Sequence, residues 1–426
     1  MESIFTLYIC ACVAFWGPGL VTGSKVLLVS MDGFRWDYIE RARTPNFTEF
    51  AKMGSRAEYL TGVFSSKTFP SHYTIATGLY EENHGIVGNY MYDPTTQRTF
   101  SPRNAKENEW WGGEPIWVTA RRQSLKTAVY NWAGSEAEIM GYRPNFYTAY
   151  NKSIPFSERL DTVIEWLTNT SFAVELVLLH FQEPDSTGHD FGPYGAETLA
   201  KVEEMDGVLE DLVSRFDAAN LWSSVNVIVT SDHGMANTSD QRMVDILDYV
   251  DHNAIKETPT LGAVVNLLVM PDMRDEVYRN LSKAPHMSVY MREDVPTRFH
   301  FSNNPRILDI VAIADEGWTI VMNASEYWYA SDQGGHGYDN ELMSMKPIFY
   351  ARGPDIKVGY TSATFNLVDI YPLVCELLNV TAAPNNGSLD VAATILNRPV
   401  SEAVQERSNY VFWLLVLFVS SFCNMH

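Results

Sequence analysis

Aspartate and histidine residues recur near glycine in four separated segments of this sequence. The segments are VSMDGF, FQEPDSTGH, TSDHGM and GGHGYDN, and they supply Asp32, Asp185, His189, Asp232, His233 and His336. Zinc accepts carboxylate oxygen and imidazole nitrogen together, whereas calcium and magnesium prefer shells of oxygen alone. Three residues of each type therefore predict two adjacent zinc sites.

Each of these short motifs is ambiguous when it is taken alone. An Asp-Gly pair after a strand usually forms only a turn, and a loop histidine beside glycine usually has an ordinary hydrogen bond. Asp or His residues beside glycine recur in four segments, and they follow apolar runs of the sequence. This recurrence favours metal binding over four unrelated turns.

Thr68 is the candidate nucleophile, in the segment SKTFPSHY. Pro70 suits the first turn of a helix, which we expect to run to about Gly78. Thr68 would then lie just before a helix N-terminus, where backbone N–H groups favour an incoming phosphate. A threonine hydroxyl is a weak nucleophile, and coordination by zinc would activate it. The alternative is a simple helix cap, which is the commoner role of threonine at such a position.

A parallel sheet is the element that would bring these residues together. Four apolar runs predict buried parallel strands, at Lys25–Ser30, Val174–Phe181, Val225–Thr230 and Pro347–Ala351. Helical patterns lie between them, for example Phe156–Leu167 and Ala196–Phe216. This alternation predicts a doubly wound α/β fold with a mostly parallel central sheet and helices on both faces. The segment from about 271 to 306, rich in charge and turn residues, is expected to form an insertion or edge subdomain.

Composition limits the classes of partner. The chain has 426 residues, of which 46% are hydrophobic and 19% charged, enough for one large α/β domain or two smaller ones. A net charge of −21 argues against binding of nucleic-acid polymers. A small phosphorylated substrate remains compatible with this charge, because bound metal ions would set the local field.

The two ends of the chain predict secretion and membrane attachment. Residues 1–23 have an apolar run followed by small residues, which is typical of a signal peptide. A folded domain at 24–395 and a polar spacer at 396–409 precede a hydrophobic segment at 410–426. Its apolar part, Tyr410–Cys423, is short for a spanning helix, which needs roughly 20 residues. A lipid-anchor (GPI) signal is therefore favoured over a short transmembrane helix.

Cysteine and asparagine usage agrees with an extracellular glycoprotein. Cys375 is the one cysteine in the predicted body, and we expect it to be a buried thiol rather than a nucleophile, so no disulfide framework is expected to hold the fold. Eight glycosylation sequons occur, at Asn46, Asn151, Asn169, Asn237, Asn280, Asn323, Asn379 and Asn386. We therefore expect N-glycans and a location at the cell surface, on the extracellular face of the plasma membrane.

A family resemblance rests on six longer motifs spread over about residues 25 to 390. They are VSMDGFRWDY, SKTFPSHYTIATGLYEENHGIVGNYMYDP, EPDSTGH, VTSDHGM, ADEGWTI and GGHGYDN. With these motifs the sequence resembles the ecto-nucleotide pyrophosphatase/phosphodiesterase family of the alkaline phosphatase superfamily, and most of all its short single-domain members. The resemblance implies the phosphodiesterase α/β core of that family.

The resemblance also implies a role for each candidate residue. One zinc ion would be held by Asp32, Thr68, Asp232 and His233, and the other by Asp185, His189 and His336. Asn89, with the backbone N–H of Phe69, would hydrogen-bond a phosphoryl oxygen. Phe69 and Tyr150 would enclose a nucleobase. A neutral Asn89 suits a diester with a single phosphoryl charge, and hydrolysis would pass through a threonine-bound intermediate.

Several positions depart from the family pattern. Ser71 stands where many relatives have asparagine, and His180 and Gln182 replace an aromatic and an acidic residue. The segment Trp132–Glu136 departs from the usual WPGSD. Because none of these positions is a predicted metal ligand, the departures concern specificity rather than catalysis.

These residues are compatible with three alternative functions. The leading hypothesis is an extracellular zinc hydrolase that converts ATP, ADP, NAD or dinucleoside polyphosphates to nucleoside monophosphates. A phosphodiesterase for choline headgroups is the first alternative, with Trp110, Trp111 and Trp132 as candidate aromatic contacts to a quaternary ammonium. A catalytically silent surface binding protein is the second, although no ligand or nucleophile is missing.

Overall fold

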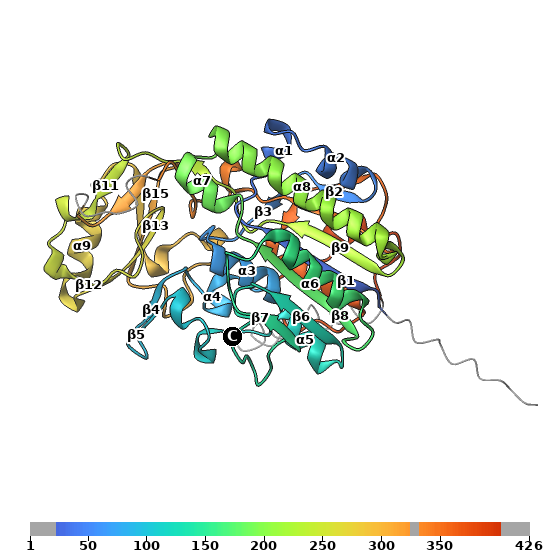
Figure 1. Ribbon diagram of the computed structural model, residues 1–426. Coiled ribbons are helices and arrows are strands. Elements are labelled where there is room, and N and C mark those ends of the chain that lie inside the picture. The colour runs from blue at the N-terminus through green and yellow to red at the C-terminus, as the bar shows by residue number, and fades with distance from the viewer. Residues whose placement is uncertain (1–22, 324–331, 402–426) are drawn as a thin grey trace, which may run out of the picture.

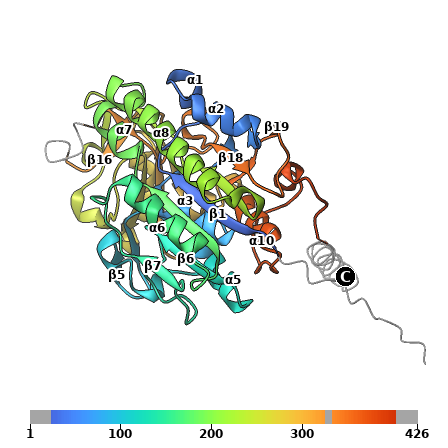
Figure 2. The ribbon, with the colours of Figure 1, turned by 45° about the vertical axis from the view of Figure 1, so that its right-hand side comes forward.

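An eight-stranded sheet forms the centre of the protein. The computed structural model describes residues 23–323 and 332–401, so the predicted signal peptide, most of the spacer and the hydrophobic C-terminal segment lie outside the described residues. The sheet has the order β19 (Tyr360–Ser362), β2 (Ser55–Ala57), β18 (Phe349–Arg352), β9 (Val225–Thr230), β1 (Lys25–Met31), β8 (Val174–Phe181), β6 (Lys126–Tyr130) and β7 (Phe146–Thr148). Figure 2 labels β19, β18, β1, β6 and β7 of this sheet, which follow one another in this order across the molecule.

The direction of the strands is mostly parallel. β9, β1, β8, β6 and β7 are parallel neighbours, whereas β18 pairs antiparallel with both β9 and β2. The predicted α/β fold with a mostly parallel sheet is therefore confirmed. The prediction that Pro347–Ala351 forms a parallel strand is wrong in direction, because a buried strand has the same apolar pattern whichever way it runs.

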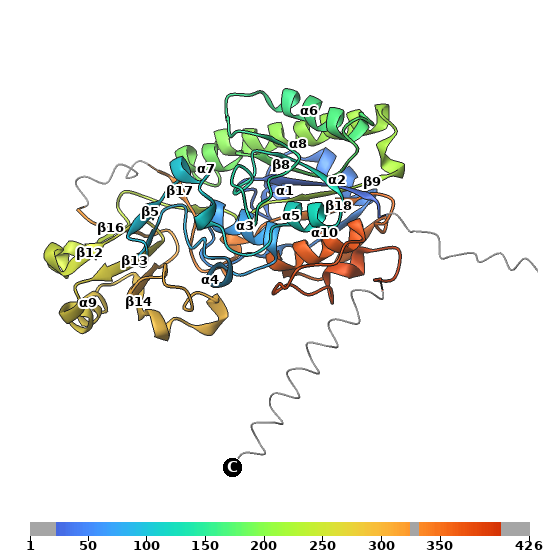
Figure 3. The ribbon, with the colours of Figure 1, turned by 90° about the horizontal axis from the view of Figure 1, so that it is seen from below.

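Helices cover both faces of the sheet. Figure 3 shows α6 (Phe156–Thr168) and α8 (Ala196–Ala218) on one face, and α5 (Ile116–Arg122) and α10 (Ile370–Leu378) on the other. Strand β1 alternates between the two layers: its Leu27 and Val29 pack with the α6 and α8 side, and its Val26 and Leu28 pack with the opposite side. The remaining helices are α1 (Tyr38–Arg41), α2 (Pro45–Lys52), α3 (Thr68–Thr77), α4 (Glu81–His84), α7 (Asp185–Phe191) and α9 (Arg274–Leu281).

The structure also tests where the helix at Thr68 begins and whether Cys375 is buried. The predicted helix after Thr68 is present, but α3 begins at Thr68 and not at Pro70. Cys375 is a buried free thiol in α10, as its apolar surroundings predict.

A subdomain lies beside the main sheet (Figure 1). Its antiparallel sheet has the order β12 (Ile255–Glu257), β13 (Val264–Val269), β15 (Ile310–Ala314) and β14 (Met287–Met291), with α9 packed on it. It therefore extends well beyond the expected 271–306. Arg306 ties it to the main body, since the guanidinium donates hydrogen bonds to the carbonyls of Gly85 and Trp110 and pairs with Asp93 at 3.1 Å.

The sheet order explains how distant segments meet. β1 lies between β8 and β9, with Met31 beside Phe181 and Ser30 beside Thr230. The chain segments that leave the carboxyl ends of these three strands therefore emerge side by side, as expected for a ligand site in an α/β fold. Among the described helices, none combines the length and the apolar character required to cross a bilayer.

Candidate active site

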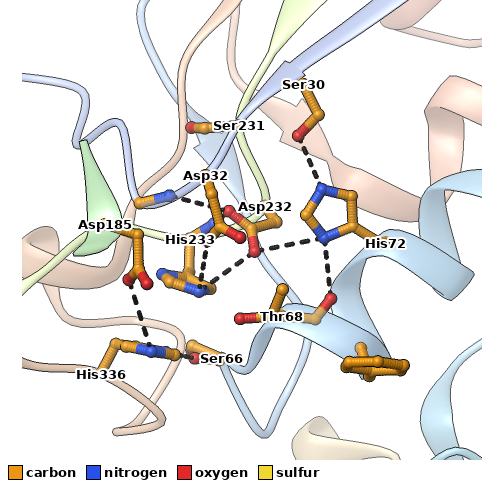
Figure 4. Close-up of polar contacts among 12 residues, drawn as sticks. Ser30, Asp32, Ser66, Thr68, His72, Asp185, Ser231, Asp232, His233 and His336 are labelled. Atoms are coloured by element: carbon orange, nitrogen blue, oxygen red, sulfur yellow. Dashed lines mark hydrogen bonds and ion pairs between the residues drawn. The ribbon is translucent and has the colours of Figure 1, made fainter. Parts of the chain in front are cut away.

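Two groups of aspartate and histidine side chains meet at the carboxyl ends of β1, β8 and β9. One group is Asp32, Asp232 and His233, and the other is Asp185, His189 and His336; in each, the potential ligand atoms lie within 4.8 Å of one another. The groups adjoin, since the rings of His233 and His336 are stacked with centroids 3.6 Å apart, and Figure 4 shows Asp185 and His336 beside the first group. All six predicted acidic and imidazole residues are thus brought together by the fold.

Hydrogen bonds orient the three histidines in the same way. The Nδ1 atoms of His189, His233 and His336 contact the backbone carbonyls of Gly334, Gly234 and Ser66 at 2.9, 2.8 and 2.7 Å. Because a carbonyl can only accept, each Nδ1 carries the proton. Each Nε2 therefore faces the carboxylates, which is the orientation of histidines that ligate metals through Nε2.

The aspartates are held by one oxygen and leave the other oxygen without a hydrogen-bond donor. Asp232 Oδ1 accepts from the backbone N–H groups of Gly33 and His233, both at 3.0 Å, and Asp32 Oδ2 lies 3.0 Å from His180 Nε2. Within the described part of the chain, four buried atoms of the two groups have no hydrogen-bond partner: Asp32 Oδ1, Asp185 Oδ1, Asp232 Oδ2 and His233 Nε2. Buried polar atoms of this kind are normally satisfied. Divalent cations would satisfy all four, so the donor set fits two metal ions.

The electrostatics of the site also favour cations. Burial and the charges of Asp232 and Asp185 raise the pKa of Asp32 well above its usual value. Burial alone would also raise the pKa of Asp232, but the neighbouring His233 and His72 hold it well below its usual range. Three carboxylates in one water-poor site repel one another, and bound divalent ions would remove that repulsion.

Thr68 lies where a nucleophile would be needed. It is the first residue of α3, and Figure 4 shows its hydroxyl pointing between the two metal groups. The capping position of α3 belongs to Lys67, which has an extended backbone and no capping side-chain hydrogen bond. The structure therefore does not support the alternative that Thr68 is a simple helix cap.

Asn89 is fixed by the backbone of the nucleophile segment. The N–H of Phe69 donates to Asn89 Oδ1 at 2.9 Å. This orientation leaves the Asn89 amide N–H₂ free to donate to a phosphoryl oxygen. It also means that the Phe69 N–H, expected to contact the phosphoryl group itself, is already used to position Asn89.

The two predicted base-stacking residues come from different parts of the fold. Phe69 packs on its inner side against Phe100 and Trp111, with ring centroids 5.7 and 6.3 Å apart. Tyr150 lies in the loop after β7 and is 54% exposed. Its backbone N–H donates to Glu136 Oε1 at 3.2 Å, so Glu136 holds this loop.

Trp110, Trp111 and Trp132, the candidate contacts for a quaternary ammonium, are buried core residues. Their indole N–H groups are already paired, with Glu107, Ala105 and His72 respectively. They therefore form no exposed aromatic cage, and the residues cited for the choline alternative do not support it.

Sequence analysis missed three residues of the site. His72 Nδ1 lies 2.8 Å from the Thr68 carbonyl and 3.3 Å from Asp232 Oδ2, and its Nε2 pairs with Ser30. His180, within β8, reaches Asp32, and with His72 it completes a third Asp/His group. Because both nitrogens of His72 already have hydrogen-bond partners, this third group orients the site rather than offering a metal site. Lys67 is the third missed residue, and burial lowers the pKa of its ammonium to about 8.

Comparison with known proteins decides the family. The sequence profile described as Type I phosphodiesterase / nucleotide pyrophosphatase matches residues 26–339. The chain is 42% identical to human bis(5'-adenosyl)-triphosphatase ENPP4 over 388 residues, which cover 87% of this chain and 83% of that protein.

The chain belongs to the type I phosphodiesterase/nucleotide pyrophosphatase family.

Solved structures agree with this assignment. Human ectonucleotide pyrophosphatase/phosphodiesterase 5 superposes with a TM-score of 0.85 at 40% identity, over 88% of this chain and all of the other. The murine counterpart, solved as an inactive variant in complex with AMP, has a TM-score of 0.84 at 39% identity, with the same coverage. The protein is thus a phosphodiesterase/nucleotide pyrophosphatase, as its motifs predict, and its two Asp/His groups are candidate sites for a pair of metal ions.

Proposed function

We propose that this phosphodiesterase uses two zinc ions and Thr68 to hydrolyse ATP, ADP, NAD or dinucleoside polyphosphates, releasing a nucleoside monophosphate. The observation that carries the proposal is a set of four buried ligand atoms beside the Thr68 hydroxyl that have no hydrogen-bond partner among the described residues. Mixed carboxylate and imidazole ligands favour zinc over magnesium or calcium. Relatives named bis(5'-adenosyl)-triphosphatase, and a related structure that contains AMP, support a nucleotide substrate.

Thr68 and Asn89 have different roles in the reaction. Bound zinc would polarise the phosphoryl group and lower the pKa of the hydroxyl groups that react with it. Thr68 Oγ1 forms a bond to phosphorus while the bond from phosphorus to the leaving oxygen breaks, which gives a threonine-bound nucleotide. Water then cleaves that ester, releases the nucleoside monophosphate and restores the threonine. Asn89, held by the Phe69 N–H, donates to a phosphoryl oxygen and stabilises the negative charge.

Aromatic side chains account for the preference for nucleotides. Phe69 has a rigid backing of Phe100 and Trp111, whereas Tyr150 is exposed in a loop, so a base can enter between a fixed face and an adaptable one. Stacking of a base on an aromatic ring contributes about 1–3 kcal/mol. Glu136, bonded to the Tyr150 N–H and paired with Lys106, positions the adaptable side.

A substrate panel tests this proposal. Purified protein is incubated with ATP, ADP, NAD, diadenosine triphosphate and glycerophosphocholine, and the products are separated by chromatography; Thr68→Ala serves as the matched inactive variant. Release of a nucleoside monophosphate by the wild type, and its loss in Thr68→Ala, are expected. Choline release without nucleotide hydrolysis would favour the headgroup alternative, and the absence of any hydrolysis would favour a silent binding protein.

We also propose a location at the cell surface, through a C-terminal lipid anchor. The support is the sequence outside the described residues and the exposure of five sequon asparagines, at 151, 169, 237, 379 and 386. Treatment of expressing cells with a phosphatidylinositol-specific phospholipase should release the protein. Full retention on cells would instead favour a short transmembrane helix.

A further inference from the structure

Arg159 is a buried arginine of α6 that has no acidic partner. It is 0% exposed, and within the described part of the chain no carboxylate pairs with its guanidinium. It shares the buried face of α6 with Val163 and Leu167, and its guanidinium carbon lies 5.1 and 5.8 Å from the ring centroids of Phe156 and Phe181. A leucine or methionine would pack among these side chains without the cost of burying a charge. Packing alone therefore does not explain an arginine at this position.

The guanidinium of Arg159 joins two segments of the chain. Its Nε and Nη2 donate to the carbonyls of Ile154 and Lys152, at 3.1 and 3.3 Å. Its Nη1 donates to the His180 carbonyl at 3.3 Å and to Gln182 Oε1 at 2.9 Å. The first two acceptors belong to the loop between β7 and α6, and the other two lie at the carboxyl end of β8. The planar, forked guanidinium is suited to bridging in this way, whereas the ammonium of a lysine is a single point.

Each of the two joined segments carries a residue of the proposed active site. The loop between β7 and α6 contains Tyr150. The segment after β8 leads to Asp185, and the Ser186 N–H donates to the Gln182 carbonyl at 3.3 Å. The end of β8 is fixed, because β8 lies between β1 and β6 in the central sheet. Arg159 thus ties the Tyr150 loop to a fixed edge of the metal-site region.

The place of the Tyr150 ring depends on its backbone. The side chain is 54% exposed, so packing does little to hold it. Its N–H donates to Glu136 Oε1 at 3.2 Å, and the next residues form a turn in which the Ser153 N–H donates to Asn151 Oδ1 at 3.0 Å. The loop then reaches the two carbonyls that Arg159 holds. A loop fixed at both ends loses less conformational freedom when a base binds to its ring, which favours binding.

We propose that Arg159 is a positioning residue that fixes the Tyr150 loop to the end of β8 and thereby sets the affinity for the nucleoside that Tyr150 stacks on. This inference rests on the proposed nucleotide hydrolysis and deepens it, because it assigns the base preference partly to a residue outside the site. Arg159 contacts none of the predicted metal ligands through its hydrogen bonds, so its effect passes through the loop.

Two phosphodiesters with the same leaving group test this role. The p-nitrophenyl ester of thymidine monophosphate carries a base, whereas methyl p-nitrophenyl phosphate carries none. Arg159→Met removes the hydrogen bonds and keeps an unbranched apolar side chain. The ratio of kcat/KM for the nucleotide ester to kcat/KM for the methyl ester should fall about 5- to 100-fold, mainly through KM of the nucleotide ester, as expected for the loss of one stacked base. Arg292→Gln, which loses a hydrogen bond to the Ile307 carbonyl in the subdomain, is the matched control and should keep the wild-type ratio.

A double variant separates positioning of Tyr150 from a general structural effect. Tyr150→Ala lowers the ratio by itself, and Arg159→Met should lower it no further in that background, because both changes remove the same contact with the base. Gln182→Leu removes only the hydrogen bond at 2.9 Å and should lower the ratio about two- to tenfold. It decides alone if Arg159→Met does not fold.

The other outcomes contradict either the positioning role or the proposed function. An unchanged ratio in Arg159→Met overturns the positioning role, even if both activities fall together, since the effect would then lie at the metal groups. An equal fall of the ratio with and without the Tyr150 ring also overturns it, as does an unchanged ratio in Gln182→Leu when that variant decides alone. A wild type that hydrolyses neither ester contradicts the proposed function instead.

Discussion

His180 is the residue that most clearly supports a metal ligand without being one of the predicted ligands. Its Nε2 lies 3.0 Å from Asp32 Oδ2, which leaves the other oxygen of Asp32 directed at the metal groups. Residues that orient metal ligands in this way commonly change metal affinity when they are replaced.

Replacement of His180 by phenylalanine should weaken zinc binding while the fold is kept. The ring fills a similar volume in β8, but Asp32 loses its donor, and zinc affinity should fall by about 10- to 100-fold. Competition with a chromophoric chelator measures the affinity, and thermal unfolding checks that the fold persists. The exposed His252→Ala is the control; equal affinity in His180→Phe and wild type would show that Asp32 needs no such support.

Residue types predicted the ligands better than they predicted the residues that orient them. Asp32, Asp232 and the others are each next to a recognisable strand end, so local sequence was sufficient to find them. His180 and His72 instead act on groups 148 and 42 residues away in the sequence, at Asp32 and Ser30. The pair of His180 depends on the register of β1 and β8, and the pair of His72 depends on how α3 packs beside β1; no local pattern specifies either.

The local sequence predicted the bounds of a strand well where the strand is buried along its length. The strands at Val174–Phe181 and Val225–Thr230 have the predicted bounds, because an apolar run between polar turns defines both ends. The direction of β18 could not be predicted, since a buried strand is apolar either way. The subdomain was underestimated because its strand β13 reads like a strand of the main sheet, and only Asn266 interrupts its apolar run.

His84, at the end of α4, makes the stability of the α3–α4 region depend on pH. Its Nδ1 accepts from the Ile86 N–H, so the neutral ring carries its proton on Nε2, beside Thr74 Oγ1. Burial, with a smaller effect from the charge of Arg306, lowers the pKa of His84 to about 3. In the unfolded chain the ring titrates near 6.5, so the unfolded state takes up a proton first as the pH falls. The stabilisation by His84 is complete above about pH 6.5 and is lost progressively toward pH 3.

His84→Gln should therefore flatten the pH dependence of stability. Between pH 7 and pH 5 the wild type should lose about 2 kcal/mol of unfolding free energy more than the variant, as expected for one histidine kept neutral by the fold. Urea denaturation at the two pH values measures this difference. Parallel losses in the two proteins would mean that His84 can be protonated in the folded state.

At the scale of the whole molecule, Arg306 helps to hold the subdomain against the main body. Arg306 is largely buried where the two meet and bonds to Gly85, Trp110 and Asp93. Arg306→Gln should lower the free energy of unfolding by about 2–3 kcal/mol, because charge-assisted hydrogen bonds are lost and Asp93 loses its partner. Denaturation against Arg103→Gln, an exposed arginine of the same region, measures the effect; equal stability of both variants would show that the subdomain is held by other contacts.

The central claim is that six acidic and imidazole side chains around Thr68 bind two zinc ions on which hydrolysis depends. Its most direct test is elemental analysis of zinc in the purified protein, with nucleotide hydrolysis measured on the same sample before chelation, after chelation and after zinc is returned. Two zinc ions per chain, loss of hydrolysis with the chelator and recovery with zinc are expected. Full hydrolysis by protein that has been stripped of metal would contradict the claim.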